Sequence, residues 1–345
     1  MKKINMLIAI LPGLFIAFAL SFLGERLSHK GPLYDAFFVA FIGSIIVGNL
    51  IRKKSFLWMG TALCKDLLIP VGLLLYGTQV NFAEVIKLKP AIFVISLINA
   101  FLYFSVIYLC NRYLFKITNN KISFLSGGAN SICGVAATAV YVPFADAKED
   151  EVTGTLLAIV ITGLIAVFST AYVIPKLMGK FMGTLTNDQY SALAGTTLNQ
   201  TGAVKLAAQL YNEKTVKVAL AIKNFRTSLI IPSALFIMFL AQNWGGTAEK
   251  MSAELKKSAV RYGIFIALLF FGASLIFTFT GMHKYSKVIE PWFKVIFGMT
   301  LASVGLLCNI KKIFKKEIFL NILSSIIAWA IVAYVSVITI YLYVK

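Results

Sequence analysis

Two segments combine glycine with hydrogen-bonding side chains where unbroken apolar residues would be expected. They are Ser126–Gly134, with the sequence SGGANSICG, and Ala194–Gly202, with the sequence AGTTLNQTG. Glycine lets the backbone leave helical geometry, and unwound backbone at membrane depth is tolerated only where it is buried in protein or lines a wet cavity. A helix that restarts there directs free N–H groups and partial positive charge into the cavity, which favours an anion. The alternative is that both segments are close-packing helix faces.

Three basic residues lie within or beside the later apolar runs. Lys223 and Arg226 are three apart and share one helix face, and Pro232 can kink the same helix. Lys205 lies about one turn after Gly202. A charge at the bilayer centre costs roughly 2.5–3.5 kcal/mol, and such residues are usually functional. The three cations therefore indicate an anionic ligand, although each could instead snorkel toward the headgroups.

Residues for acid–base or metal chemistry are scarce. Only Asp66, beside Lys65, is expected within a span, and the two histidines, His29 and His283, fall in predicted connections. The four cysteines show no CxxC spacing, and Cys133 has no partnered base in view. We therefore expect neither an enzyme nor a metal site nor a cofactor.

The surrounding sequence predicts an all-α polytopic membrane protein. Hydrophobic residues make up 59% of the 345 residues and charged residues 14%, with a mean hydropathy of +0.83. A membrane helix needs about 20 mostly apolar residues, and we expect one domain over residues 1–345 with about eleven such helices. They lie near 4–23, 35–51, 59–78, 91–110, 122–143, 152–174, 190–211, 216–241, 262–280, 292–310 and 319–343.

The net charge of +19 comes mostly from basic residues between the apolar segments, where they set the orientation of the chain in the membrane rather than bind nucleic acid. The even-numbered connections and the N-terminus hold 18 of the 33 basic residues if all eleven segments cross. By the positive-inside rule, this distribution predicts a cytoplasmic N-terminus in the cytoplasmic (inner or plasma) membrane. The basic residues would meet anionic lipid headgroups, so no nucleic-acid partner is expected.

In its two glycine-containing segments and around Lys223 and Arg226, the chain resembles the YeiH family, also called UPF0324 membrane proteins and described as sulfate exporters. The resemblance covers about residues 10 to 340 and rests on four groups of residues. They are Ser131-Ile132-Cys133-Gly134 with the Ala-rich run after it, Gly195–Val204, Lys223 with Arg226 and Pro232, and Pro291-Trp292-Phe293 with Gly298. It implies a transporter with a fold similar to the cation:proton antiporter and anion transporter superfamily, in which inverted repeats cross at two broken helices. It also implies that Asn130, Ser131, Cys133 and Gly134, with the second segment, line the site.

The chain departs from the family pattern at one place in the second segment, where two adjacent residues differ. Where the family typically shows a His followed by an acid before the Thr, this chain has Asn199 and Gln200 before Thr201. The two amides can donate and accept hydrogen bonds but do not carry a proton. We therefore expect a weaker pH dependence than in relatives with the His–acid pair.

We predict a secondary transporter that carries a small anion, sulfate-like or a sulfur-containing organic anion, by alternating access. Arg226 would supply forked hydrogen bonds to an oxyanion. The predicted substrate-binding residues are Asn130, Ser131, Cys133, Gly134, Thr197, Asn199, Gln200, Thr201, Lys205, Lys223 and Arg226. The expected partners are this solute and the lipid bilayer, and a homodimer is left open. The alternatives are an anion channel, a Na⁺- or H⁺-coupled transporter of another small solute, and a sensor or scaffold without flux.

Overall fold

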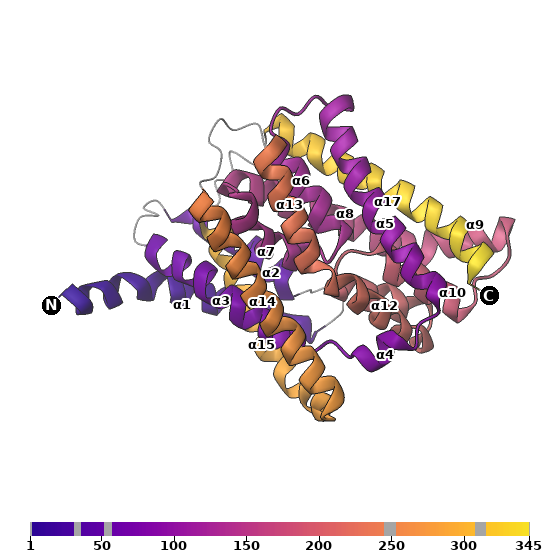
Figure 1. Cartoon of the computed structure of the whole chain (residues 1–345), viewed down its shortest axis with the longest axis horizontal. Helices are drawn as coiled ribbons and strands as arrows, with labels where there is room; N and C mark the ends of the chain where they lie inside the picture. Colours follow the sequence, from indigo (N-terminus) through magenta and orange to yellow (C-terminus); the bar gives the residue numbers. More distant parts are fainter. Residues whose placement is uncertain (1, 31–35, 52–56, 245–252, 308–314, 345) are drawn as a thin grey trace. The chain divides into compact units, whose positions relative to one another are not determined.

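The structure, a computed structural model, describes residues 2–30, 36–51, 57–244, 253–307 and 315–344. Within these ranges every regular element is helical (Figure 1), which confirms the predicted all-α class. Seven of the eleven predicted segments each correspond to one helix, with ends that differ by up to nine residues; the largest difference is at the start of α14 (Ala253–Phe279), which was predicted near 262. The other four, near 122–143, 152–174, 190–211 and 216–241, each consist of more than one helical piece.

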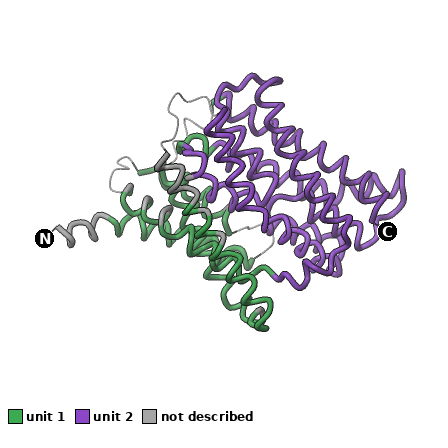
Figure 2. The backbone as a smooth tube through the Cα atoms, in the orientation of Figure 1, with its two compact units in different colours: residues 1–80, 148–153, 261–315 green, residues 81–147, 154–260, 316–345 purple. Residues whose placement is uncertain are grey.

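The chain divides into two compact units, each built from separate stretches of sequence (Figure 2). Unit 1 comprises residues 1–80, 148–153 and 261–315, and unit 2 comprises residues 81–147, 154–260 and 316–345. The expectation of one domain over residues 1–345 stays a prediction. Both regions that interrupt the apolar pattern fall in unit 2, so the candidate site is described within that unit.

The helices of unit 1 are continuous and pack closely through glycine. They are α1 (Lys2–Ser28), α2 (Ala36–Leu50), α3 (Trp58–Gly77), α14 (Ala253–Phe279, which begins in unit 2), the 3₁₀ turn η5 (Met282–Tyr285) and α15 (Ser286–Leu307). A Cβ atom at Gly48 of α2 would lie 2.2 Å from the carbonyl oxygen of Leu306 in α15. Only glycine fits at that approach, which fixes the distance between these two helices.

Unit 2 contains the longer apolar helices and all of the interrupted ones. Its elements are α4 (Phe82–Ile86), α5 (Pro90–Leu109), η2 (Cys110–Leu114), α6 (Asn120–Ser131), α7 (Val135–Ala145), α8 (Glu149–Phe168, which begins in unit 1), η3 (Ser169–Val173), α9 (Ile174–Phe181), α10 (Asn187–Thr197), α11 (Thr201–Tyr211), η4 (Glu213–Thr215), α12 (Val216–Ser228), α13 (Ile230–Trp244) and α17 (Lys316–Tyr343). Two of these, η2 and η3, are π-helical turns that continue α5 and α8.

Both glycine-containing segments are interrupted, as predicted. The first ends α6 at Ser131 and restarts as α7 at Val135, and the second ends α10 at Thr197 and restarts as α11 at Thr201. A third interruption lies near Pro232, where the helix from Glu213 and the helix to Trp244 are bent by 40° at Leu229. Proline has no N–H to donate to the preceding turn, which explains a bend on its N-terminal side.

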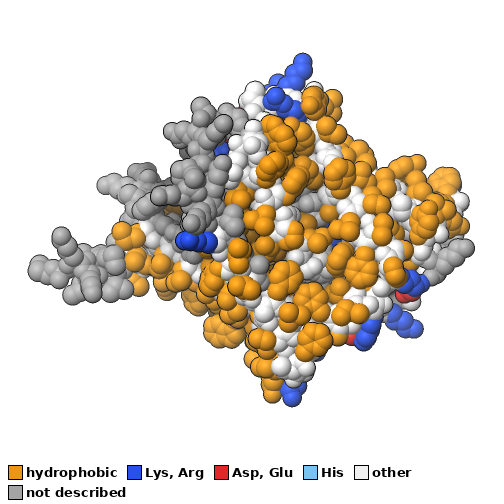
Figure 3. All heavy atoms as spheres, viewed as in Figure 1, with side chains coloured by type: hydrophobic (Ala, Val, Ile, Leu, Met, Phe, Trp, Pro, Cys, Tyr) orange, Lys and Arg blue, Asp and Glu red, His pale blue; other side chains and the backbone are white. Residues whose placement is uncertain are grey.

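Several helices are long and apolar enough to cross a membrane. In the part of the chain that the structure describes there are five, or six if the bent pair counts as one span. They are Ile10–Ser28, Pro90–Leu114, Glu149–Phe181, Ser286–Leu307 and Lys316–Tyr343. Hydrophobic side chains cover much of the face seen in Figure 3, and those of α5 are typical, with Phe101 71% exposed. Such outward apolar surface is what lipid contact requires, while the count of eleven spans stays a prediction.

Candidate functional site

The interruption between α6 and α7 is set by the backbone of Gly134. This residue has φ of +69° and ψ of −111°, a conformation that residues with a Cβ rarely adopt. Its N–H donates to the carbonyl oxygen of Ala129 at 2.7 Å, which closes the end of α6. The carbonyl oxygens of the last turn of α6 therefore lose the partners that a continuing helix would supply.

The interruption between α10 and α11 is an extended stretch of three residues. Leu198 has ψ of 139° and Gln200 has ψ of 141°, so both residues have extended backbone before α11 begins. The start of α10 is fixed by a capping box, in which Thr186 and Gln189 exchange side-chain and backbone hydrogen bonds. The break therefore follows a helix, α10, whose N-terminal end is fixed by its cap.

The two interruptions meet inside unit 2. The side-chain amide of Asn199 donates to Oδ1 of Asn130 at 2.6 Å, and both residues are buried. A Cβ at Gly134 would lie 3.6 Å from Cβ of Asn199 and 3.5 Å from Cγ of Gln200. Tyr103 of α5 donates its hydroxyl to the carbonyl oxygen of Thr197 at 2.7 Å. We call this contact region, Asn130–Gly134 with Thr197–Thr201, the meeting point.

Arg226 of α12 joins the ends of both interrupted helices. Its Nη1 donates to carbonyl oxygens at the end of α10, those of Gly195 (3.3 Å), Thr196 (2.7 Å) and Leu198 (3.0 Å). Its Nη2 donates to carbonyl oxygens at the end of α6, those of Asn130 (3.3 Å) and Ser131 (2.9 Å). Helix C-termini carry partial negative charge, so the guanidinium lies where a cation is favoured.

Lys223 extends the same arrangement by one turn of α12. Its Nζ donates to the carbonyl oxygen of Ile132 at 2.5 Å. The side chains of Lys223 and Arg226 are both 0% exposed, so neither reaches a headgroup region. Their hydrogen bonds are directed at backbone carbonyls, which sequence reasoning did not anticipate.

The remaining predicted residues divide by exposure. Ser131, Cys133, Thr197 and Asn199 are buried, whereas Gln200 is half-buried and Thr201 and Lys205 of α11 are exposed. The hydroxyl groups of Ser131 and Thr197 donate to carbonyl oxygens of their own helices, those of Gly128 and Leu193. The polar groups of the meeting point that reach its surface therefore belong to the start of α11.

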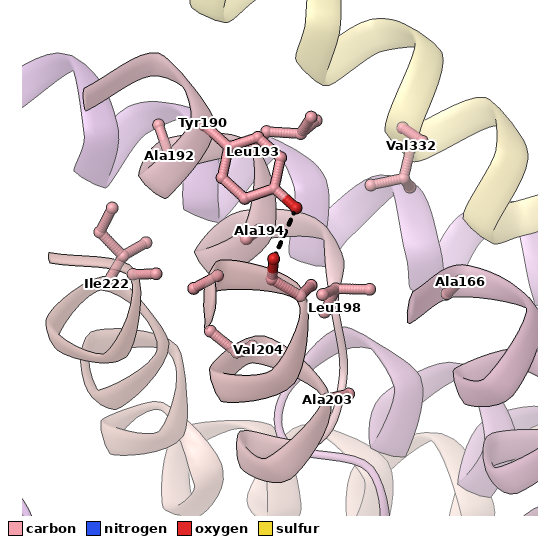
Figure 4. Close-up of a cluster of buried hydrophobic side chains, with 14 of the residues drawn as sticks. Ala166, Tyr190, Ala192, Leu193, Ala194, Leu198, Ala203, Val204, Ile222 and Val332 are labelled. Carbon is pink, nitrogen blue, oxygen red and sulfur yellow. Dashed lines mark hydrogen bonds between the residues drawn. The ribbon is translucent and has the colours of Figure 1, made fainter. Parts of the chain in front are cut away.

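A cluster of buried side chains holds the two halves of the second broken helix together (Figure 4). Tyr190 of α10 donates its hydroxyl to the carbonyl oxygen of Ala207 in α11 at 3.0 Å, and its ring stacks on Tyr211 at a centroid distance of 3.8 Å. Leu193, Leu198, Val204 and Ile222 surround it from α10, the extended link, α11 and α12. The position of α11 is thus fixed by packing, although the backbone between α10 and α11 is extended.

A network of buried neutral side chains, which sequence reasoning missed, continues from the meeting point. Asn321 of α17 donates to the hydroxyl of Ser126 at 2.8 Å and accepts from the amide of Asn111 at 2.8 Å. Ser126 also lies 3.0 Å from the hydroxyl of Thr155. The available signal was the presence of asparagine inside otherwise apolar helices, since a buried amide needs hydrogen-bond partners.

Acidic and metal-binding groups play no visible part in this region. Among the described residues of unit 2, no Asp or Glu is buried. Within the ranges that the structure describes, no group of three or more His, Cys, Asp or Glu side chains could hold a metal ion. The chemistry that the arrangement offers is electrostatic: buried cations, helix ends and neutral hydrogen-bonding groups.

Known proteins resemble this chain over most of its length. A family model described as Conserved hypothetical protein 698 matches residues 10–324. A UPF0324 membrane protein of Streptococcus pneumoniae serotype 4 is 28% identical over 324 residues, 92% of each chain. One of Streptococcus agalactiae serotype V is 26% identical over 313 residues, 88% of this chain and 89% of the relative. The UPF0324 inner membrane protein YeiH of Salmonella typhimurium is 23% identical over 313 residues, 88% of this chain and 84% of its own.

These matches confirm the resemblance to UPF0324 membrane proteins that the sequence motifs indicated. The family model begins at residue 10 and ends at residue 324, which takes in both interrupted segments and α12. The relatives bear the name of membrane proteins, and the apolar helices described above agree with that name.

Proposed function

Because the chain belongs to the Conserved hypothetical protein 698 family, whose UPF0324 relatives are membrane proteins, we propose that it is a secondary transporter of a small anion. The anion is sulfate-like or a sulfur-containing organic anion. In this proposal the anion binds at the meeting point, on the side where α7 and α11 begin.

The balance of charge at the meeting point carries the proposal. The C-terminal ends of α6 and α10 contribute about −0.5 each, and Arg226, which stays protonated in proteins, offsets about that sum. The N-terminal ends of α7 and α11 contribute about +0.5 each. No buried Asp or Glu of the described part of unit 2 opposes them. The remaining potential is positive, and an anion is the ligand that it favours.

The start of α11 supplies the groups for binding. The first N–H groups of a helix have no partner within the helix and can donate to an oxyanion. Gln200 and Thr201 add side-chain donors at this end, and exposed Lys205 adds a positive charge about one turn further. Asn130 and Asn199 fix the distance between the two interruptions through their hydrogen bond. In this proposal Lys223 and Arg226 act through their positive charge, because their N–H groups donate to backbone carbonyl oxygens at the ends of the interrupted helices.

The remaining parts of the proposal concern placement and partners. The protein lies in the cytoplasmic membrane with its N-terminus inside, which is the orientation that the positive-inside rule favours. Its partners are the anion and the surrounding lipid, and a second copy of the chain is compatible with the same mechanism. Movement of one group of helices against another would expose the meeting point alternately to each side.

Flux measurements in proteoliposomes test the proposal. Purified protein is reconstituted, loaded with unlabelled sulfate or a small sulfonate, and exposed to the labelled anion outside. We expect saturable uptake that internal anion accelerates, because a carrier exchanges its substrate. Gly134→Ala should abolish it, since the meeting point depends on that backbone conformation.

Gly179→Ala is the matched control, because a Cβ at Gly179 meets nothing within 4 Å, and it should retain wild-type uptake. Flux that neither saturates nor responds to internal anion would favour an anion channel instead. Specific binding without any flux would favour a sensor or scaffold, and absence of both would refute an anion ligand of this class.

A further inference from the structure

The carbonyl oxygens around Arg226 have the geometry of a cation site. Five of them, from the ends of α6 and α10, lie 2.7–3.3 Å from the two terminal nitrogens of the guanidinium. Three come from one helix end and two from the other. Such converging carbonyl dipoles are the ligands that membrane proteins use for cations where helices unwind.

We infer that these five carbonyl oxygens form a cation cage whose permanent occupant is the guanidinium of Arg226, so that no free coupling cation binds there. The occupant belongs to the chain itself, and removing it leaves a cage that accepts a free guanidinium ion. Given the proposed function, the consequence for transport is that anion uptake proceeds without bound Na⁺.

Burial explains why the cage and the arginine need each other. The Arg226 side chain is fully buried, and no buried Asp or Glu of the described part of unit 2 can pair with it. A buried charge requires compensation, and the negative ends of α6 and α10 are what surrounds this one. Without the guanidinium, the five carbonyl oxygens would lose its hydrogen bonds inside the protein.

Lys223 closes the same region to a further cation. Its ammonium donates to the carbonyl oxygen of Ile132, the next residue along the chain from Ser131. A Na⁺ ion entering the cage would meet two fixed side-chain donors already bound to the carbonyls it needs. The alternative of a cation coupled through backbone carbonyls is therefore disfavoured by this arrangement.

Chemical rescue of purified protein tests the cage directly, without reference to transport. Arg226→Ala should unfold at a lower temperature than the wild type in detergent. Guanidinium chloride at about 10 mM, far below denaturing concentrations, should raise the midpoint of this variant by about 5 °C, because it binds the folded state. Sodium chloride or tetramethylammonium chloride at the same concentration should give a smaller increase, because neither supplies planar N–H donors.

Arg112→Ala is the matched control, because Arg112 is an exposed arginine of the same unit. Guanidinium should leave the midpoints of this variant and of the wild type unchanged. A response of Arg226→Ala no larger than that of Arg112→Ala would overturn the inference.

A second pair of variants decides the question if Arg226→Ala does not fold. Arg226→Lys keeps a cation in the cage, whereas Arg226→Met removes the charge at similar volume. We expect folded protein from Arg226→Lys and a lower midpoint or no folded protein from Arg226→Met. Equal behaviour of the two would overturn the inference, since it would show that the cage does not require a cation.

Transport measurements then test the consequence for coupling. Anion uptake by the wild type should change less than about two-fold when external Na⁺ is replaced by N-methylglucamine, a cation too large for the cage. Uptake that falls in proportion to Na⁺ would refute Na⁺ independence. Absence of any anion uptake would refute the proposed function, and the rescue experiment would still decide whether the cage exists.

Discussion

In unit 1 Gly48 and Gly305 lie inside continuous helices that nearly touch, whereas in unit 2 Gly134 lies between two helices at a positive φ. A Cβ at Gly48 or at Gly305 of unit 1 would collide with the backbone of a neighbouring helix. A Cβ at Gly134 would instead be strained by its own backbone conformation. The presence of glycine therefore does not distinguish a close helix contact from a helix break, whereas the φ angle of the glycine does.

The same distinction applies within the two segments of unit 2. Gly127, Gly128 and Gly195 lie inside α6 and α10, and a Cβ at each would contact Phe104, Ile237 or Ile222. For these three the packing alternative fits the structure, and for Gly134 the interruption does. The segment Ser126–Gly134 thus contains packing glycines, Gly127 and Gly128, as well as the glycine at the helix break, Gly134. Only Gly134 determines where the meeting point lies.

Gly134→Ala should have the largest effect. The positive φ and the approach to Cγ2 of Ile159 at 2.9 Å should together lower the free energy of unfolding by about 3 kcal/mol. Thermal unfolding in detergent measures this loss, with Gly179→Ala as the unaffected control. A midpoint unchanged from the wild type would remove the basis for treating Gly134 differently from packing glycines.

Gly48→Ala should come next and should separate stability from binding. Its Cβ would lie 2.2 Å from the carbonyl oxygen of Leu306, so α2 and α15 must move apart, at a cost of about 2 kcal/mol. The dissociation constant of the folded protein for its anion, from isothermal titration, should stay within about two-fold of wild type. Gly272→Ala, which meets nothing within 4 Å, is the control in the same unit. Loss of anion affinity in Gly48→Ala as large as that in Gly134→Ala would break the comparison.

Lys205→Gln should weaken anion binding with little effect on folding. The side chain is exposed on α11, so its removal costs mainly the attraction for the anion, about 1 kcal/mol or roughly five-fold in the dissociation constant. Lys214→Gln removes another exposed charge, on η4, and should bind as the wild type does. Equal weakening in both variants would mean that the effect reflects net charge alone.

The smallest effect concerns pH. The double variant Asn199→His with Gln200→Glu restores the two titratable groups that the resembling family typically shows. We expect its uptake to vary more steeply between pH 6 and pH 8 than that of the wild type, because a histidine titrates in that range. Parallel pH profiles of uptake for the two proteins would show that proton binding at positions 199 and 200 does not affect transport.

The sequence predicted the interruptions well because they are local events. Glycine with asparagine inside an apolar run marks both breaks, and Pro232 marks the bend at Leu229 within three residues. Helix ends were predicted within five residues for most uninterrupted segments, since loss of apolar character is read directly along the chain. However, α14 and α15 begin nine and six residues earlier than predicted, because their first turns are polar.

The partners of the buried side chains could not be predicted because they are distant in sequence. Arg226 donates to a carbonyl group 96 residues away at Asn130, and Asn321 lies 210 residues from Asn111. Every residue carries a carbonyl group, so no side-chain pattern marks the ones that surround a guanidinium. The expectation that Arg226 would hold the anion itself stays a prediction, and the structure adds a second role for it.

The π-helical turn at Cys110–Leu114 determines where Asn111 can point. Such a turn accommodates one residue more than an α-helix of the same rise, and each residue of an α-helix advances the side-chain direction by about 100°. Deleting one residue there would restore regular α-helix and rotate Asn111 away from Asn321 and Ser324, its present partners. Asn321 and Ser324 of α17 would then lose this partner while still buried, so a one-residue deletion should be more harmful here than elsewhere in α5.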